Sequence, residues 1–168
     1  MINWQYFPKS KQTIDTLLKV IECFNVIGPE ISSKHFKYHS NEVLEKIRSP
    51  LESLGFKVET GKKRKEKIRV PVLFGLNGKP EKSFDVDGFH EESKIVLEVE
   101  AGRAVDNNQF LKDFFEACVM YDVDYLILAI RKSYRGGKDF EKILTFFDTM
   151  YASGRMTIPL KGLLVIGY

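Results

Sequence analysis

Apolar residues along this chain recur with helical spacing in some segments and with strand-like spacing in others. A first helical stripe covers residues 14–24, and Gly28-Pro29 is predicted to end this helix. A second stripe follows Ser40, a candidate N-cap, and continues to Gly55. Pro50 lies inside it and predicts a kink or a split, because proline supplies no N–H and crowds the preceding turn. Two N-terminal helices are therefore expected.

The following segments alternate between strand and helix patterns. Strands are predicted at 56–60, 68–74 and 83–89, where short β-branched and aromatic runs are separated by turn residues. Pro71 places the second of them at a sheet edge or a bulge. The remaining predicted elements are a strand at 94–100, a helix from Asp106 to Tyr121, a buried strand at 125–130, a helix at 139–152 and a strand at 160–166. This order predicts one α/β domain, with a central mixed β-sheet flanked by helices on both faces.

Composition limits the classes of protein to which the chain can belong. It has 168 residues, 43% hydrophobic and 29% charged, which is ordinary for one compact soluble domain. No apolar run approaches the roughly 18 residues of a membrane span, and the N-terminus lacks a secretory pattern. The two cysteines form no CxxC pair, which argues against a disulfide scaffold or a zinc site. We therefore expect a cytoplasmic protein with no membrane partner.

Carboxylates gather on two neighbouring predicted strands. Asp85 and Asp87 share one face of the first strand, and Glu98 and Glu100 share one face of the second. A hairpin would bring the two pairs together, and like charges opposed across a sheet destabilise it. A divalent cation would neutralise them, because Mg²⁺ takes oxygen ligands. The alternative is that two edge strands expose these side chains to solvent, although the run around Glu98 is apolar enough for a central strand.

Basic residues are concentrated on both sides of this acidic hairpin. The net charge is only +3, but residues 62–67 precede the hairpin and residues 131–138 follow it. Lysine and arginine contacts to phosphates give sequence-independent affinity for nucleic acid. The candidate contacts are Lys62, Lys63, Arg64, Lys65, Lys67, Arg131 and Arg135. A solvated loop is the alternative for the first segment.

Four segments together resemble the PD-(D/E)XK nuclease superfamily, which includes many restriction endonucleases. They are residues 51–59, the Asp87-Gly88 strand, the 97–100 strand and the 125–130 strand. The resemblance covers residues 40–130, and the order and spacing of these short motifs carry it. It implies a restriction endonuclease-like core, to which the N-terminal helix and the final helix and strand are additions.

The resemblance implies a metal site. In the family an Asp and an acidic residue on the next strand hold a divalent cation, and Asp87 and Glu98 match these positions. The family's lysine two positions later is Glu100 in this chain, a substitution that some active restriction enzymes of the family share. Glu100 would then orient the attacking water or help to hold a second cation. Mg²⁺ is the expected cofactor, with Mn²⁺ as a substitute.

The resemblance also brings in residues outside the acidic strands. Some members add an acidic residue from the helix that corresponds to 40–54, where Glu42 lies; the alternative is an acidic residue that the helix N-terminus favours. The helix after Glu100 can carry a Lys or Gln that approaches the scissile phosphate. Arg103, Gln109 and Lys112 are the candidates there, and a solvated helix face is the alternative for Lys112.

Three classes of function follow. The first is a metal-dependent DNA endonuclease of restriction type that works as a homodimer, because a duplex has two strands and one domain carries one active site. The second is a repair, recombination or mobile-element nuclease of the same superfamily. The third is a non-catalytic nucleic-acid-binding descendant, in which Glu100 marks lost activity.

Overall fold

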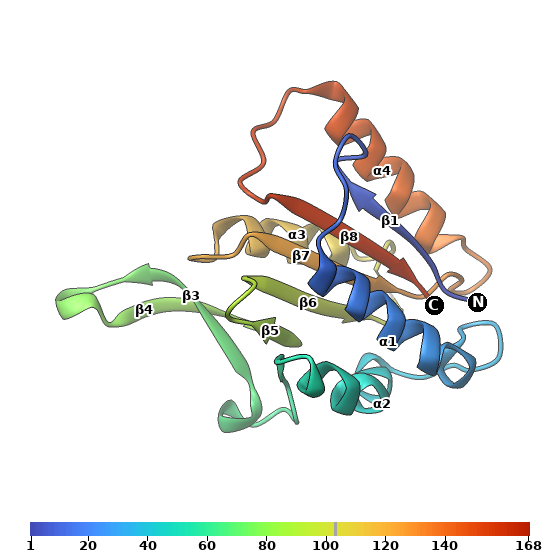
Figure 1. The fold of residues 1–168 in the computed structure, drawn as a ribbon, viewed down its shortest axis with the longest axis horizontal. Helices are drawn as coiled ribbons and strands as arrows, with labels where there is room; N and C mark the ends of the chain where they lie inside the picture. The colour runs from blue at the N-terminus through green and yellow to red at the C-terminus, as the bar shows by residue number, and fades with distance from the viewer. Residues whose placement is uncertain (103) are drawn as a thin grey trace.

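A six-stranded mixed sheet forms the centre of the protein in the computed structural model, which describes residues 1–102 and 104–168 (Figure 1). The strand order is β1-β8-β7-β6-β5-β2; β6, β7 and β8 run parallel, and the outer strands pair antiparallel. The strands are β1 (Asn3–Phe7), β2 (Lys57–Val58), β5 (Gly88–His90), β6 (Ile95–Glu100), β7 (Tyr125–Ile130) and β8 (Gly162–Gly167). The predicted α/β fold with a mixed sheet is confirmed.

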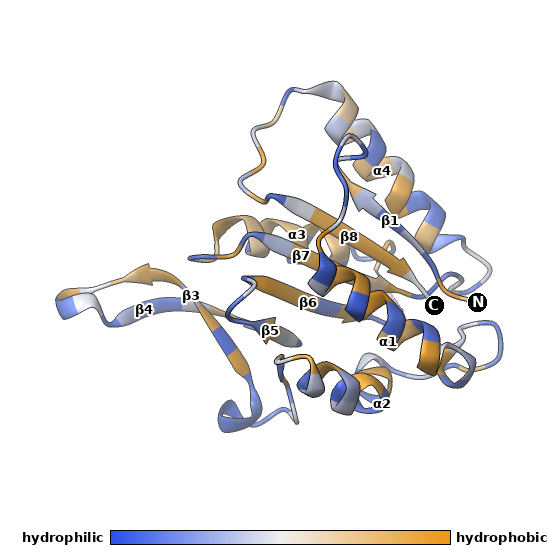
Figure 2. Ribbon diagram, viewed as in Figure 1, coloured by the Kyte–Doolittle hydropathy of each residue, from blue (hydrophilic) through white to orange (hydrophobic). Residues whose placement is uncertain are grey.

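Helices cover both faces of this sheet. The described residues form four α-helices: α1 (Asp15–Ile31), α2 (Ser40–Ser53), α3 (Gln109–Val119) and α4 (Asp139–Ser153). One apolar core joins α1 and α2 to the sheet, and a second core joins α3 and α4 to it. Figure 2 shows the apolar residues concentrated in β6, β7 and β8, between these layers. No helix in the described ranges has the length and apolar character that crossing a membrane requires.

Alternation along β6 decides which way its acidic side chains face. Ile95, Leu97 and Val99 belong to the core under α1 and α2, whereas Val96 belongs to the core under α3 and α4. Successive side chains on a strand point to opposite faces. Glu98 and Glu100 therefore lie on the α3 side of the sheet.

A separate two-stranded hairpin projects from the sheet (Figure 1). It consists of β3 (Ile68–Phe74) and β4 (Pro80–Val86), joined through the short 3₁₀ turn η2 (Leu76–Gly78). The register shifts between Pro71 and Leu73, so the predicted edge or bulge is confirmed. The single strand expected at 83–89 is wrong: it divides at Asp87 into β4 and β5, which belong to different sheets.

The N-terminal helix continues beyond its predicted end. α1 passes through Gly28 and Pro29 and reaches Ile31. A Cβ on Gly28 would lie 3.2 Å from the Ile2 side chain, so glycine here allows the N-terminal segment to pack closely against the helix. Pro29 falls in the last turn, where its missing N–H removes only one hydrogen bond. The strand that follows Ile2, β1, was not predicted.

The boundaries of α2 and α3 also differ from the sequence expectations. α2 is a single helix through Pro50, and its N-cap is His39. Ser40, the predicted cap, instead accepts a hydrogen bond through Oγ from the backbone N–H of Ala101 at 3.2 Å. α3 begins after the left-handed residue Asn108 rather than at Asp106.

Candidate functional site

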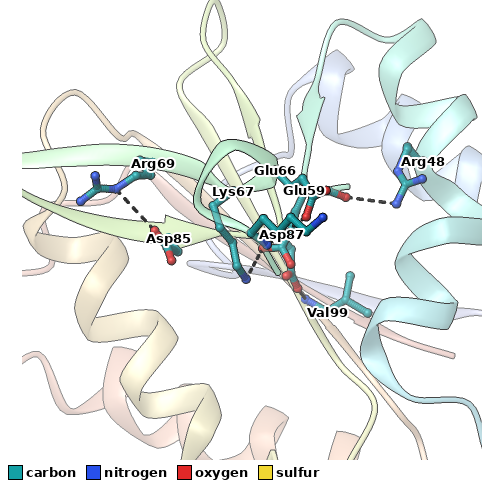
Figure 3. Close-up of polar contacts among 9 residues, drawn as sticks. Arg48, Glu59, Glu66, Lys67, Arg69, Asp85, Asp87 and Val99 are labelled. Atoms are coloured by element: carbon teal, nitrogen blue, oxygen red, sulfur yellow. Dashed lines mark hydrogen bonds and ion pairs between the residues drawn. The ribbon is translucent and has the colours of Figure 1, made fainter. Parts of the chain in front are cut away.

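Asp87 lies at the junction between the hairpin and the central sheet. Its Oδ2 accepts a hydrogen bond from the backbone N–H of Val99 at 2.8 Å (Figure 3). Gly88 pairs with Leu97 in the β5–β6 ladder, so the preceding residue, Asp87, faces Glu98. Two predicted metal ligands are thus brought together across neighbouring strands. Burial, followed by the charge of Glu59, raises the pKa of Asp87 to about 6, although the Val99 hydrogen bond opposes this rise.

Glu98 and Glu100 share the α3-facing side of β6, and both are half-buried. Burial raises the pKa of Glu98 well above its ordinary value, and the charges of Asp87 and Asp113 add to the rise. Burial also raises the pKa of Glu100, to about 9, and the charge and hydrogen bonding of Asp113 reinforce it. These carboxylates therefore repel one another in a poorly solvated site.

Asp113 completes this group, although the sequence analysis did not select it. It lies in α3, is 4% exposed, and accepts a hydrogen bond through Oδ1 from Gln109 Nε2 at 3.0 Å. Its Oδ2 is buried without a hydrogen-bond partner among the described residues. The sequence carried a signal for it, because Asp113 is three residues after Phe110 and four before Ala117, on the buried stripe of its helix. We call Asp87, Glu98, Glu100 and Asp113 the acidic cluster.

Two lysines lie beside the acidic cluster. Lys112 Nζ is 3.9 Å from Asp113 Oδ1 and 3.5 Å from Glu116 Oε1, and its charge opposes the pKa rise of Glu98 and Glu100. Lys67 Nζ donates to the buried Glu59 carboxylate at 2.7 Å (Figure 3). Both ends of the cluster therefore have a cation within electrostatic reach.

The pKa of Lys67 records its position between carboxylates. Burial alone would lower this pKa. The hydrogen bond and the negative charge of Glu59 raise it, as do the charges of Asp85 and Asp87, and together they outweigh burial, so the pKa of Lys67 is raised. Arg48 Nη2 donates to the backbone oxygen of Glu59 at 3.2 Å. Glu59 thus holds Lys67 beside Asp87, a contact that the sequence analysis missed.

Two acidic candidates lie apart from the acidic cluster. Asp85 is exposed on β4, where its Oδ1 is 3.6 Å from Arg69 Nε (Figure 3). Glu42 is exposed in the first turn of α2, on the opposite face of the sheet, and accepts a hydrogen bond from the backbone N–H of His39 at 2.8 Å. The structure does not bring Glu42 to the metal position expected for it, because this capping contact occupies its carboxylate.

The basic candidates separate into two regions. Lys62, Lys63, Arg64 and Lys65 are exposed around the 3₁₀ turn η1 (Arg64–Glu66), between β2 and β3. A cavity of about 380 Å³ beside them is lined by Lys62, Arg64, Lys67, Arg69 and Asp85, and we call it the basic groove. Arg135 is exposed after β7, whereas Arg131 is buried. Arg103 lies outside the described residues.

The acidic cluster consists of carboxylates, and carboxylate oxygens are the ligands that a hard divalent cation such as Mg²⁺ takes. The oxygens of the cluster repel one another, and a buried carboxylate oxygen without a donor is costly unless a proton or a cation satisfies it. As the side chains stand in the described part of the chain, no three or more His, Cys, Asp or Glu groups could hold a metal ion. Binding therefore requires that the carboxylates move together, which neutralisation of their charge favours.

Comparison of the chain with known protein families, with curated proteins and with solved structures found no match. The function is therefore inferred from the geometry and electrostatics of the described residues. The features that bear on it are the acidic cluster, the two lysines beside it and the basic groove.

Proposed function

We propose that this protein is a metal-dependent DNA endonuclease of the PD-(D/E)XK, restriction endonuclease-like type. The acidic cluster carries the proposal: carboxylates from β6, from α3 and from the residue before β5 lie close enough to raise one another's pKa in a half-buried site. Such repulsion persists in a fold when a bound ligand offsets it. The mixed sheet with helices on both faces supports the fold-level part of the proposal.

Asp87, Glu98 and Glu100 would hold Mg²⁺, with Mn²⁺ as a substitute, and Asp113 joins them as a further candidate ligand. A bound cation would polarise the phosphoryl oxygens and increase the acidity of a coordinated water. Val99 fixes the Asp87 carboxylate through its N–H, and Gln109 fixes that of Asp113. These two hydrogen bonds would orient the proposed ligands, which come from two different parts of the chain.

Glu100 stands where the family has a lysine, and the neighbouring lysines offer a replacement for the missing charge. Lys112 is 58% exposed and can swing toward a phosphate, whereas Lys67 is held by Glu59. We propose that Lys112 stabilises charge at the scissile phosphate and that Lys67 acts as a positioning residue for Asp87. Lys112→Gln should then lower kcat for DNA cleavage.

Plasmid cleavage tests the proposed function most directly. We expect nicking or linearisation of supercoiled DNA with Mg²⁺ or Mn²⁺, and none with chelator. Discrete fragments on longer DNA would assign restriction-type activity, and structure-dependent cuts would assign a repair or recombination nuclease. Metal-independent DNA binding without cleavage would overturn the enzymatic proposal in favour of a non-catalytic nucleic-acid-binding protein.

The exposed basic segment 62–65, from which Lys62 and Arg64 line the basic groove, is expected to supply affinity for DNA rather than chemistry. Replacing Lys62, Lys63 and Lys65 with Gln should weaken binding to different DNA sequences about equally, because phosphate contacts carry no sequence information. The slope of log affinity against log salt should fall by somewhat less than one unit for each lost contact. Lys67 is left intact, since its removal would uncover the buried Glu59.

A matched triple variant at the exposed Lys11, Lys19 and Lys142 provides the control for charge alone. Fluorescence anisotropy in the absence of divalent metal measures both sets. Equal changes in the two triple variants would show that residues 62–65 form an ordinary solvated loop.

We propose that the protein works as a homodimer. The hairpin exposes Leu73, Phe74 and Leu76, and Tyr121, after α3, is also exposed. The Phe74 ring packs edge-on against Tyr121 at 5.0 Å between centroids, which joins Tyr121 to the apolar surface of the hairpin. Exposed apolar surface of this kind favours a protein partner, and a second copy would present two active sites to a duplex. Sedimentation velocity, with and without DNA, measures the mass that decides this.

A further inference from the structure

A cavity of about 790 Å³ opens at the carboxyl ends of the parallel strands β6 and β7. Ala101 and Gly102 follow β6 and Arg131 follows β7, and all three line it. Ligands of open α/β sheets bind at this position, outside the carboxyl ends of the strands. The volume suits a small organic molecule rather than a single ion. No member of the acidic cluster lines this cavity, so it is a separate site.

Arg131 gives the cavity a buried positive charge. The residue is only 8% exposed; Nη1 donates to Ala101 O at 2.8 Å, and Nη2 donates to Phe36 O at 3.0 Å. No carboxylate in the described ranges forms an ion pair with it. Buried charges are normally paired, and a guanidinium has five N–H donors, of which these two bonds use two. Burial raises the pKa of the buried Asp139 and the charge of Arg131 opposes this rise, but these two described residues form no ion pair, so an anion in the cavity would be the direct partner of Arg131.

The lining also includes cationic and aromatic side chains among small neutral residues. Lys37 and Arg135 add positive charge, and none of the described residues that line the cavity is acidic. Tyr134 lies beneath two guanidinium groups, 5.7 Å from that of Arg131 and 5.3 Å from that of Arg135. Ser40, the first residue of α2, also lines the cavity, so the positive end of that helix dipole adds to the field.

We propose that this cavity binds a nucleoside phosphate through its terminal phosphate group. Arg131, Arg135 and Lys37 bind the phosphate oxygens, because guanidinium groups match phosphate geometry. Tyr38 and Tyr134 line the cavity, and their hydroxyl groups and ring edges contact the base or sugar. Arg131 lies too deep for the continuous backbone of a duplex. The ligand is therefore a free nucleotide or the phosphorylated end of a DNA strand, distinct from the phosphodiester that the acidic cluster would hydrolyse.

Calorimetric titration in the presence of chelator tests this site apart from metal-dependent cleavage. The probes are thymidine 5′-monophosphate, thymidine and inorganic phosphate. We expect the monophosphate to bind more tightly than inorganic phosphate, and thymidine to bind very weakly. Lys37→Gln combined with Arg135→Gln should weaken monophosphate binding about tenfold or more, because charge-assisted hydrogen bonds are lost.

Lys34→Gln combined with Lys138→Gln removes the same charge from exposed neighbours that do not line the cavity, and should leave binding unchanged. Arg131 is left unsubstituted because it also holds two backbone carbonyls. Three results would overturn the proposal. They are equal losses of affinity in the two double variants, equal affinity of the protein for inorganic phosphate and the nucleotide, and no binding of either ligand. A 5′-phosphorylated oligonucleotide that binds more tightly than its unphosphorylated form would identify a strand end as the source, and tighter binding of the monophosphate would identify a free nucleotide.

Discussion

Asp87→Asn is expected to abolish the main Mn²⁺ site and to reduce DNA cleavage about 10³-fold or more, because a catalytic cation supplies several kcal/mol of transition-state stabilisation. The substitution keeps an oxygen that can accept the Val99 N–H, so the β5–β6 connection should remain intact. Titration calorimetry with Mn²⁺ and a plasmid cleavage assay measure the two effects. Circular dichroism confirms that the variant is folded.

Asp85→Asn is the matched control for this experiment. Asp85 lies two residues earlier but is exposed and lies beside Arg69 rather than the acidic cluster. Its substitution should leave metal affinity and cleavage nearly unchanged. Unaltered Mn²⁺ affinity in a folded Asp87→Asn variant would remove the basis of the metal site.

Glu100→Gln is expected to separate activity from stability. Cleavage should fall by about 10²–10⁴, the range for loss of a group that positions or deprotonates water. The metal-free protein should become more stable, because the substitution removes a carboxylate whose charge burial disfavours. In a domain of this size each kcal/mol gained raises Tm by about 2–4 °C. Thermal unfolding in chelator and single-turnover cleavage with Mg²⁺ measure the two quantities.

The sign of the pH dependence follows from the raised pKa of Glu100. Between the ordinary carboxyl pKa and about 9, the folded state binds more protons than the unfolded state, so metal-free stability should fall as pH rises through this window. Glu100→Gln should flatten this decline, and saturating Mn²⁺ should oppose it. Glu92→Gln, at an exposed position before β6, should change neither stability nor cleavage. If the Glu100→Gln variant cleaves DNA at the wild-type rate, Glu100 has no catalytic role, and Lys112 becomes the candidate for it.

The hydrophobic pattern predicted the order of most elements because their apolar faces are buried against local neighbours. β7 is the clearest case: every residue from Leu126 to Ile130 is fully buried, and its unbroken apolar run indicated this. β1 was missed because its existence depends on pairing with β8, at the far end of the sequence. The end of α1 was missed because Gly28 was interpreted as a helix stop. Its actual role is to allow close packing against Ile2, which no local sequence pattern reveals.

The acidic cluster could be predicted only in part for the same reason. Asp87, Glu98 and Glu100 follow from strand alternation and a hairpin, which are local features. Asp113 and Glu59 reach the site from α3 and from the segment after β2, and their involvement depends on tertiary packing. The sequence nevertheless shows that Asp113 is an acidic residue on the apolar stripe of its helix, and this pattern could have identified it. Lys67 was grouped with its exposed basic neighbours, since sequence gives no sign of its ion pair with Glu59.

A single residue, Asp87, separates the last position of the projecting hairpin from the first position of β5. The β3–β4 arm and this carboxylate are therefore continuous backbone, with no loop between them to absorb displacement. The arm also contacts the segment that follows α3, through the hydrogen bond from the Tyr121 N–H to Pro71 O at 2.8 Å. A partner that bends the arm would therefore displace two parts of the acidic cluster. The movement would reach Asp87 through the backbone, and it would reach the end of the helix that carries Asp113 through the hydrogen bond between Tyr121 and Pro71.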